Sequence, residues 1–525
     1  MSAVSRPRPW LAGRAVLPVA LVAGGLQAVA LAPWPQGGVQ VLALALLVAL
    51  LRGRPPRAAA LIGLAFGFAW MLGTFFWLFV SMHRYGHLPA PLAAAAVVAL
   101  AAAMALYPAA AAAAFAAWAP AGRGRAIALW GCLWLACELA RAQWLTGFPW
   151  GAVGYAHVDS ALALLAPWLG VYGLGAVAAM LAAGSALQAL EGRGRWRFAA
   201  AVPALALTLL PAWRGPDFTE PSTRLSVTLL QGNVPQDEKF DFERLPATLA
   251  WHVQTIAGAK SDLVVAPETA IPLLPAQLPD GLWAQLSEHF TRPVAQGGGP
   301  SALIGVPLGD FDSGYTNSVA GLGPGQDAYR YDKHHLVPFG EFVPPGFRWF
   351  IERMRIPLGD FSRGDLAQPS FAVGRERVAP NICYEDLFGE ELAARWNGRH
   401  AAPTLLANVS NIGWFGDTVA VDQHLQISRM RSLELQRPML RATNTGATAI
   451  IDHRARVTHQ LPPHQRGVLV GEVTGREGAT PFARWAAHGQ LWPLWLLALG
   501  GSLALVRWRP RAQHGAVRPG SSDQR

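Results

Sequence analysis

The chain has two parts with different patterns of apolar and polar residues, which predict a multi-pass α-helical membrane domain joined to an extramembrane α/β domain. Only 14% of the 525 residues are charged, whereas soluble domains average about 25%. Long apolar runs fill residues 1–213, and from residue 224 short apolar runs alternate with turn residues. This change of pattern predicts a membrane domain over 1–213, an α/β domain over 224–475, a last transmembrane helix over 490–507 and a disordered cytoplasmic tail over 508–525.

Seven apolar segments in the first part, followed by an eighth at Leu491–Val506, predict eight transmembrane helices. Most approach or exceed the ~20 residues that cross a bilayer. Arginines cluster before the first segment and after the second, fourth, sixth and eighth, while the alternate loops hold only Arg84. By the positive-inside rule this predicts that both termini are cytoplasmic and that the α/β domain lies on the far side of the membrane. The first seven segments are Ala15–Leu31, Val39–Leu51, Ala58–Val80, Pro89–Trp118, Ala126–Ala140, Leu162–Leu190 and Phe198–Ala212.

The polar composition argues against nucleic-acid and metal binding. The net charge is +10, but the arginines lie in short clusters between apolar runs, which is a membrane-topology pattern. The three cysteines and 14 histidines show neither a disulfide framework nor zinc-ligand spacing. We therefore expect no nucleic-acid partner and no metal.

The second part is long enough for one packed α/β domain. Apolar runs ending in turn residues predict strands, and longer amphipathic stretches predict helices between them. Hairpin-like pairs at Ala302–Leu322 and Ala447–Val470 indicate a sandwich of sheets with helices outside. The expected strands are Leu225–Gln231, Leu263–Ala266, Ala302–Val306, Thr316–Gly321, Val378–Ile382, Thr404–Asn408, Met439–Thr443, Ala447–Asp452 and Gly467–Val473, and the expected helices are Arg244–Ala259, Gly281–Phe290, Glu390–Trp396 and Val421–Arg437.

Cys383 is the only cysteine outside the apolar segments, and it stands where the run Val378–Ile382 ends. The acidic residues after it predict a helix from Asp386 to Trp396, because acidic side chains in a first turn complement the helix dipole. Backbone N–H groups at such a junction can lower a thiol pKa and bind an oxyanion. A lone cysteine is more often a buried structural residue, so the catalytic hypothesis depends on partners.

Glu268 and Lys333 are candidate partners, because both stand in apolar surroundings. Glu268 follows the run Leu263–Ala266, and α/β proteins place active-site groups at the carboxyl ends of strands. A partly desolvated glutamate can act as a general base. Lys333 can direct a fixed cation at an oxyanion, with Glu341 holding it in place. Taken alone, the glutamate is better explained as a helix cap or a salt-bridge partner, and the lysine as an ordinary surface residue.

In this order the three residues resemble the Glu–Lys–Cys triad of the nitrilase (carbon–nitrogen hydrolase) superfamily. Lys333 begins Lys-His-His-Leu-Val-Pro-Phe-Gly-Glu, and Cys383 begins Cys-Tyr-Glu. With eight spans around the triad, nearly the whole chain resembles the apolipoprotein N-acyltransferase family. It departs from that family at Phe240, where Trp is frequent, and at Ile412, where Asp is usual. Further motifs that carry the resemblance are Thr146–Trp150, Leu230–Gln236, Asn408–Asn411, Arg429–Arg431 and Arg441–Gly446.

The resemblance implies a bacterial inner-membrane protein whose catalytic domain is periplasmic. It also implies an αββα sandwich and an acyl transfer in two steps that needs no cofactor. In the first step Glu268 takes the thiol proton, and Cys383 attacks the acyl ester of a phospholipid, which we expect to be phosphatidylethanolamine. Lys333 and a backbone N–H near Tyr384 stabilise the oxyanion. In the second step the amine of the diacylglyceryl-cysteine at a lipoprotein N-terminus resolves the thioester, which completes lipoprotein maturation.

Further residues are expected to support the triad or to bind substrate. The supporting candidates lie beside Lys333 or Cys383 in the sequence, and the binding candidates are aromatic or polar residues of loops and turns. The supporting residues are Glu341, Tyr384 and Glu385, and the binding residues are Trp150, Trp349, Phe350, Phe388, Asn408, Ser410 and Trp414.

The loop Pro344–Phe361 is rich in aromatic and apolar residues, which either pack on the domain or enter the bilayer. We hypothesise that it dips into the bilayer and gates the entry of lipid. Replacing Trp349 and Phe350 with serine should then slow acylation while leaving the fold intact. Unchanged acylation, measured as acyl-enzyme formation, would contradict the hypothesis.

Two alternatives stay open. A membrane-anchored amidase of the nitrilase type would use the same triad and resolve the thioester with water, but it needs no eight-span platform. A transporter or binding protein with an inactive nitrilase-like domain is the other alternative. Transport sites usually need charges inside the membrane, and the spans contain few besides Glu138 and Arg141.

Overall fold

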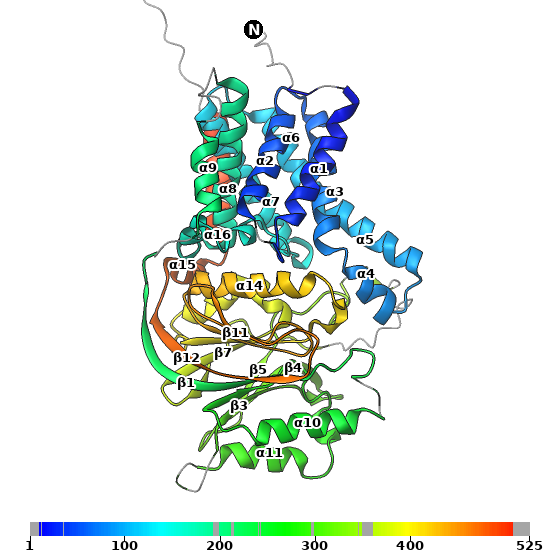
Figure 1. Ribbon diagram of the computed structural model, residues 1–525, viewed down its shortest axis with the longest axis vertical. Coiled ribbons are helices and arrows are strands. Elements are labelled where there is room, and N and C mark those ends of the chain that lie inside the picture. The colour runs from blue at the N-terminus through cyan, green and yellow to red at the C-terminus, as the bar shows by residue number, and fades with distance from the viewer. Residues whose placement is uncertain are drawn as a thin grey trace, which may run out of the picture.

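A computed structural model describes residues 10–507 except 12, 35, 193–198, 212–214, 240, 242, 294, 296–298, 345 and 349–360. A bundle of apolar helices stands on one face of a domain that is built from two β-sheets (Figure 1). The chain passes from the bundle into the long strand β1 (Thr219–Gln231) and returns to the bundle through α15 (Pro481–Gly489) and α16 (Trp492–Arg507).

Each of the eight predicted apolar segments contains or overlaps a helix of the bundle. Apolar side chains with good helix propensity, mostly Ala and Leu, fill these helices, and prolines stand in the first turns of α3, α5 and α8. The helices are α1 (Val16–Val29), α2 (Gly37–Leu51), α3 (Pro56–Phe75), α4 (Leu78–Val80), α5 (Ala90–Met104), α6 (Leu106–Trp118), α7 (Arg123–Gln143), α8 (Ala166–Glu191), α9 (Ala201–Leu209) and α16, with short turns η1 (Gly13–Ala15), η2 (Ser81–Tyr85), η3 (Trp144–Thr146), η4 (Val153–His157) and η5 (Ala161–Leu165).

By length and composition, three helices of the described chain can cross a membrane: Pro56–Phe75, Ala90–Trp118 and Ala161–Glu191. The pair α15 and α16, bent by 89°, can form a fourth. Helices α1 and α2 are apolar but have only 14 and 15 residues. The structure therefore supports an apolar helical bundle, and the eight crossings stay a prediction.

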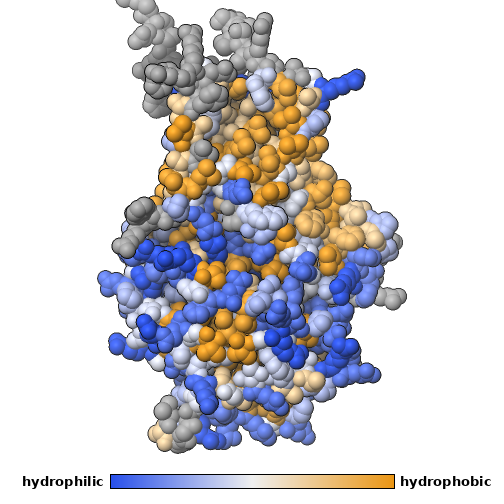
Figure 2. Space-filling model, viewed as in Figure 1, coloured by the Kyte–Doolittle hydropathy of each residue, from blue (hydrophilic) through white to orange (hydrophobic). Residues whose placement is uncertain are grey.

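The surface changes character between the bundle and the sheet domain. Apolar atoms gather over the bundle, whereas the sheet domain is covered mostly by hydrophilic residues (Figure 2). Large apolar side chains of the bundle such as Val22, Leu106 and Leu496 are exposed. Contiguous exposed apolar surface of this kind is unfavourable in water and is expected of a protein in contact with lipid.

Two six-stranded sheets form the second part, with strand orders β12-β1-β2-β3-β4-β5 and β11-β10-β9-β8-β7-β6. Parallel pairs lie at the centre of each sheet, β1–β2–β3 in one and β7–β8–β9 in the other. Side chains of both sheets, among them Val227, Leu303 and Val409, make the apolar core between the sheets. The strands after β1 are β2 (Leu263–Val265), β3 (Ser301–Asp310), β4 (Gly314–Leu322), β5 (Tyr329–Asp332), β6 (Phe371–Val373), β7 (Glu376–Ile382), β8 (Leu405–Ser410), β9 (Met439–Thr443), β10 (Ala449–Ile451), β11 (Val457–Gln460) and β12 (Gly467–Gly478).

Helices cover both outer faces, so the domain has the predicted α-β-β-α layering. Helices α10 (Leu245–Ala257) and α11 (Leu282–Thr291) lie on the far side, and α14 (Ala420–Leu435) lies between the second sheet and the bundle (Figure 1). The remaining short helices are η7 (Pro275–Gln277), η9 (Cys383–Leu387), α13 (Gly389–Ala393), η10 (Ala394–Trp396) and η11 (Ile412–Phe415).

Helix α14 joins the bundle to the sheets through buried polar side chains. Gln423 accepts hydrogen bonds from the indoles of Trp77 and Trp150, at 3.2 and 2.8 Å. Gln426 accepts from the backbone N–H of Ala32 and donates to the carbonyl of Tyr155. Because buried polar groups must be paired, these bonds fix how the bundle sits on the domain.

Two sequence expectations are wrong in detail. The stretch Ala447–Val470 is not one hairpin, because β10 pairs with β11 while β12 pairs with β1 in the other sheet. The helix expected from Asp386 to Trp396 is broken into η9, α13 and η10. The break falls at Phe388, whose φ of −106° and ψ of 79° are not helical. At the next residue, Gly389, a Cβ would lie 2.5 Å from a side-chain nitrogen of Arg431 in α14, so only glycine fits this close contact.

Candidate active site

Cys383 lies at the first residue of η9, directly after β7 in the second sheet. Its φ angle is +53°, a left-handed conformation that is uncommon for a residue with a side chain. Its carbonyl accepts hydrogen bonds from the side chains of Asn408, at 3.2 Å, and His424, at 3.3 Å. These two hydrogen bonds fix the strained backbone at Cys383. Backbone strain of this kind is typical of functional sites.

The thiol of Cys383 is held in its protonated form. Burial and the nearby Glu268 carboxylate raise its pKa to about 12, and they outweigh the opposing effects of Lys333, the Ser410 hydroxyl and the Asn411 N–H. The Ser410 hydroxyl is buried and makes no other hydrogen bond among the described residues. The sequence expectation of a lowered thiol pKa is therefore wrong, because desolvation exceeds the effect of the backbone N–H groups. Such a thiol needs a base before it can attack.

Glu268 is buried just beyond the end of β2, in the first sheet. Its Oε1 accepts from Asn317 Nδ2 at 2.7 Å and lies 3.5 Å from Lys333 Nζ. Its Oε2 accepts from the Asn411 N–H at 2.8 Å. Because that same N–H also lies beside the thiol, the carboxylate is directed at Cys383.

Lys333 follows β5 and is 1% exposed. Its Nζ lies 2.9 Å from Glu341 Oε1 and 3.5 Å from Glu268 Oε1. Burial alone would lower the pKa of this ammonium, but the Glu341 and Glu268 carboxylates outweigh it and hold the pKa above its usual value. Lys333 therefore keeps its proton, and Cys383, Glu268 and Lys333 meet where the two sheets adjoin.

Glu341 and Glu385 hold the backbone around Lys333 and Cys383. Glu341 pairs with Lys333 and also accepts a hydrogen bond from the Val337 N–H at 2.7 Å. Glu385 accepts from the Ile382 N–H at 2.6 Å, from the His334 N–H at 2.7 Å and from the Tyr331 hydroxyl. One carboxylate thus ties the strand before the cysteine to the segment that carries the lysine.

The other predicted residues lie at different distances from the thiol. Asn408 is fully buried, between Asn381 and Arg441, and contacts the Cys383 carbonyl. Tyr384 donates to the Gly147 carbonyl at 3.1 Å, which joins the cysteine segment to the bundle. Phe388 stacks on His335 with a centroid distance of 3.6 Å.

Trp150 and Trp414 lie where the bundle meets the domain. Trp150 is buried, donates to Gln423 and packs its ring against His424. Trp414 packs edge-on against Tyr85 of the bundle. Substrate-binding roles for these residues stay predictions. Trp349 and Phe350, like the departure at Phe240, lie outside the described residues.

Sequence reasoning missed Asn317 and Lys239, which both contact Glu268. Asn317, inside β4, donates from one amide nitrogen to Glu268 and Glu341, each at 2.7 Å. Lys239, in the loop after β1, donates to the Glu268 carbonyl at 3.2 Å. Both carried a signal: asparagine is disfavoured inside strands, and Lys239 is one of only three lysines among 43 basic residues.

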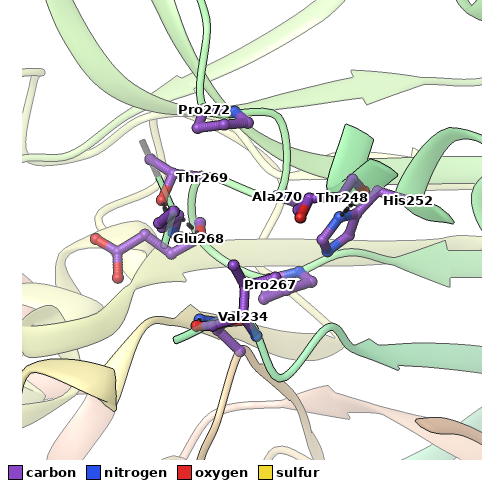
Figure 3. A pocket seen from close by; sticks show the side chains of 10 residues that line it. Val234, Thr248, His252, Pro267, Glu268, Thr269, Ala270 and Pro272 are labelled. Atoms are coloured by element: carbon purple, nitrogen blue, oxygen red, sulfur yellow. Dashed lines mark hydrogen bonds between the residues drawn. The ribbon is translucent and has the colours of Figure 1, made fainter. Parts of the chain in front are cut away.

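A small pocket of about 10 Å³, which is room for roughly one water molecule, lies beside the turn that carries Glu268. Figure 3 shows the segment Pro267–Ala270 along it, with the Glu268 carboxylate on the side opposite His252. Among the described residues no group of three or more His, Cys, Asp or Glu side chains is arranged to hold a metal ion.

Gly305 of β3 packs directly against the turn that carries Glu268. A Cβ at this position would lie 2.2 Å from the Pro267 carbonyl oxygen and 2.8 Å from the Glu268 Cα. Gly305→Ala is therefore expected to displace the carboxylate, and a shift of about 1 Å can cost about 100-fold in rate. The measurement is the rate of acyl-enzyme formation. Gly467→Ala, where the nearest side-chain atom is 3.4 Å away, is the matched control, and equal rates for the two variants would contradict the expectation.

Comparison with known proteins covers nearly the whole chain. Residues 23–184 match the family model for an apolipoprotein N-acyltransferase N-terminal domain, and residues 226–482 match that for a carbon-nitrogen hydrolase. An apolipoprotein N-acyltransferase from Verminephrobacter eiseniae is 53% identical over 92% of this chain and 95% of its own, and one from Ralstonia nicotianae is 46% identical over 90% of each. A solved CN-hydrolase superfamily protein from Xanthomonas campestris covers 51% of this chain and 96% of its own, with 17% identity and a TM-score of 0.36.

Proposed function

We propose, since this chain belongs to the apolipoprotein N-acyltransferase family, that it transfers an acyl chain through a thioester on Cys383. It is an acyltransferase with a carbon–nitrogen hydrolase domain. The observation that supports the thioester route is the meeting of a protonated thiol, a buried carboxylate and a buried ammonium within one site. No other cysteine lies in the sheet domain.

In the first step, Glu268 removes the thiol proton while the sulfur of Cys383 attacks the carbonyl carbon of an acyl ester. The tetrahedral oxyanion is stabilised by the Lys333 ammonium and by a backbone N–H near Tyr384. The C–O bond to the glycerol oxygen then breaks, and Glu268 returns its proton to that oxygen. A lysophospholipid leaves, and the acyl chain stays on Cys383 as a thioester.

In the second step, an amine attacks the thioester carbonyl and Glu268 accepts the amine proton. The C–S bond breaks, the sulfur recovers a proton from Glu268, and the product is an amide. The acceptor is the α-amine of a diacylglyceryl-cysteine at the N-terminus of an apolipoprotein. The donor is a phospholipid, with phosphatidylethanolamine as the expected one.

Both substrates reach the site from the membrane, with eight helices crossing it, both termini cytoplasmic and the catalytic domain periplasmic. The exposed apolar side chains of the bundle and the positions of the arginines support this arrangement. The hydrogen bond from Tyr384 to the Gly147 carbonyl joins the proposed nucleophile directly to the bundle. In this proposed arrangement the thiol can reach the ester of a phospholipid in the outer leaflet.

The test is the intact mass of the purified protein after incubation with phosphatidylethanolamine. A gain of one acyl chain that hydroxylamine removes is the expected result, because hydroxylamine cleaves thioesters. Addition of a diacylglyceryl-cysteine peptide should then discharge the enzyme and place the chain on the peptide amine. Discharge at the same rate without the peptide would support the membrane-anchored amidase instead, and the absence of any adduct on the folded protein would contradict both functions.

The pH dependence of thiol alkylation gives an independent prediction. Burial and the Glu268 carboxylate raise the pKa of Cys383 to about 12, against 9.0 for an ordinary thiol. The reactive thiolate should therefore increase about tenfold with each pH unit below that pKa. Alkylation of Cys383 by iodoacetamide, followed by mass spectrometry, should keep rising through pH 10. A plateau near pH 7 would instead mean that Cys383 rests as a thiolate.

A further inference from the structure

Lys239 contacts the main chain at Glu268, and it belongs to the loop after the Gln231-Gly-Asn-Val motif. Its Nζ donates to the Glu268 carbonyl at 3.2 Å and to the Thr269 hydroxyl. Two of the three lysines of the chain therefore meet at this one glutamate, one at its carboxylate and one at its backbone.

Lys239 is 4% exposed, and no carboxylate of the described chain forms an ion pair with its ammonium. A buried ammonium is costly unless its charge is compensated. Burial accordingly lowers the pKa of Lys239 to about 8, although Glu268 and Cys383 act in the opposite direction. If residue 239 only had to fill space, a neutral side chain would cost less free energy to bury than an ammonium. The charge therefore points to a role in the site.

The backbone that Lys239 contacts is strained. Thr269 has a φ of +48°, in the left-handed region that a β-branched residue rarely adopts. Such a conformation persists only where the surroundings over-determine it. Gly305 packs against the turn, and a small pocket lined by Lys239, Thr248 and His252 lies beside it (Figure 3). Without the two hydrogen bonds from Lys239 the turn loses contacts that hold it in this conformation.

The carboxylate of Glu268 is fixed separately, by Asn317, Lys333 and the Asn411 N–H. These contacts set where the oxygens can lie, but they do not hold the main chain from which the side chain extends. We propose that Lys239 is a positioning residue for the general base: it clamps the Glu268–Thr269 turn and so keeps the carboxylate directed at Cys383. This inference rests on the proposed role of Glu268 in thioester formation.

The experiment is a double-mutant cycle on thioester formation in the full-length protein, followed by intact mass with phosphatidylethanolamine as donor. Lys239→Met keeps the length of the side chain and removes its charge and donors. We expect it to lower kcat for thioester formation about tenfold or more while leaving KM unchanged, because Lys239 acts through the base and not on the lipid. Lys260→Met, at an exposed lysine, is the matched control and should leave kcat unchanged.

The cycle is completed by Glu268→Gln and by the double variant. Once the base is absent its position no longer matters, so Lys239→Met should cost nothing further in the Glu268→Gln background. If the two substitutions lower kcat independently, so that their factors multiply in the double variant, the inference is wrong. A rise in KM for Lys239→Met without a change in kcat would also overturn it. If Glu268→Gln itself leaves kcat unchanged, the proposed function of Glu268 fails, and the inference fails with it.

A second pair of variants tests the clamp from its other end. Thr269→Ser keeps the hydroxyl that accepts from Lys239, whereas Thr269→Val removes it at nearly equal volume. The serine variant should retain most of kcat, and the valine variant should fall toward the level of Lys239→Met. Equal kcat values for the two variants would overturn the clamp, because a role limited to packing would favour valine over serine.

Discussion

Replacing Cys383 with alanine is expected to abolish acyl-enzyme formation and acyl transfer together. The substitution removes the only thiol beside Glu268 and Lys333 among the described residues. Neither neighbour is free to replace it as the nucleophile, because Lys333 keeps its proton and the Glu268 carboxylate accepts hydrogen bonds from Asn317 and the Asn411 N–H. The measurement is the hydroxylamine-sensitive mass gain, together with transfer to a diacylglyceryl-cysteine peptide.

The chain carries its own controls for this result. Cys132 and Cys137 both lie in α7 of the bundle. Their replacement by alanine should leave the acyl adduct in place, which separates specific acylation from chance modification of a thiol. The Cys383→Ala protein should also keep its melting temperature within a few degrees, since the side chain is only partly buried. An adduct of undiminished size on a folded Cys383→Ala protein would exclude the thioester mechanism.

For two of the three proposed catalytic residues the sequence predicted the place in the fold, because Glu268 and Cys383 each follow an apolar run that forms a strand, whereas Lys333 follows a short strand without such a run. Glu268, Lys333 and Cys383 come after β2, β5 and β7, and the carboxyl ends of such strands gather at one edge. Strand β5 itself was not predicted, because its four residues, Tyr329–Asp332, alternate with arginine and aspartate and lack a continuous apolar run. Strands β6 and β11 were not predicted either, because they have only three and four residues.

The environment of the site could not be predicted, since it depends on contacts between distant segments. Helix α14 looks solvent-exposed in the sequence because it carries Gln, His, Ser, Arg and Glu, yet almost all of it is buried. Its polar groups pair with partners far away in the chain, as Glu434 does with the Val171 N–H at 2.6 Å. The direction of the Cys383 pKa shift also follows from burial, and burial is set by the finished fold.

Lys333→Met is expected to slow thioester formation by at least about 1,000-fold. Removing an oxyanion donor alone costs about 100- to 1,000-fold. The substitution would also leave the carboxylates of Glu268 and Glu341 buried without the cation that lies 3.5 and 2.9 Å from them. One of them should then take up a proton, and a protonated Glu268 cannot act as a base. The two losses fall on the same step, and acyl-enzyme formation measures both.

A second carboxylate substitution separates these two effects of Lys333. Breaking a buried ion pair typically costs about 3–5 kcal/mol, so Lys333→Met should lower the melting temperature in detergent. Adding Glu341→Gln removes the excess negative charge and keeps an oxygen that can accept from Asn317, so the double variant should regain much of that stability. Thioester formation should stay low, because neither change restores a cation beside the oxyanion. If the double variant recovered activity along with stability, Lys333 would act only as a counter-charge, and the oxyanion would have to be stabilised by backbone N–H groups alone.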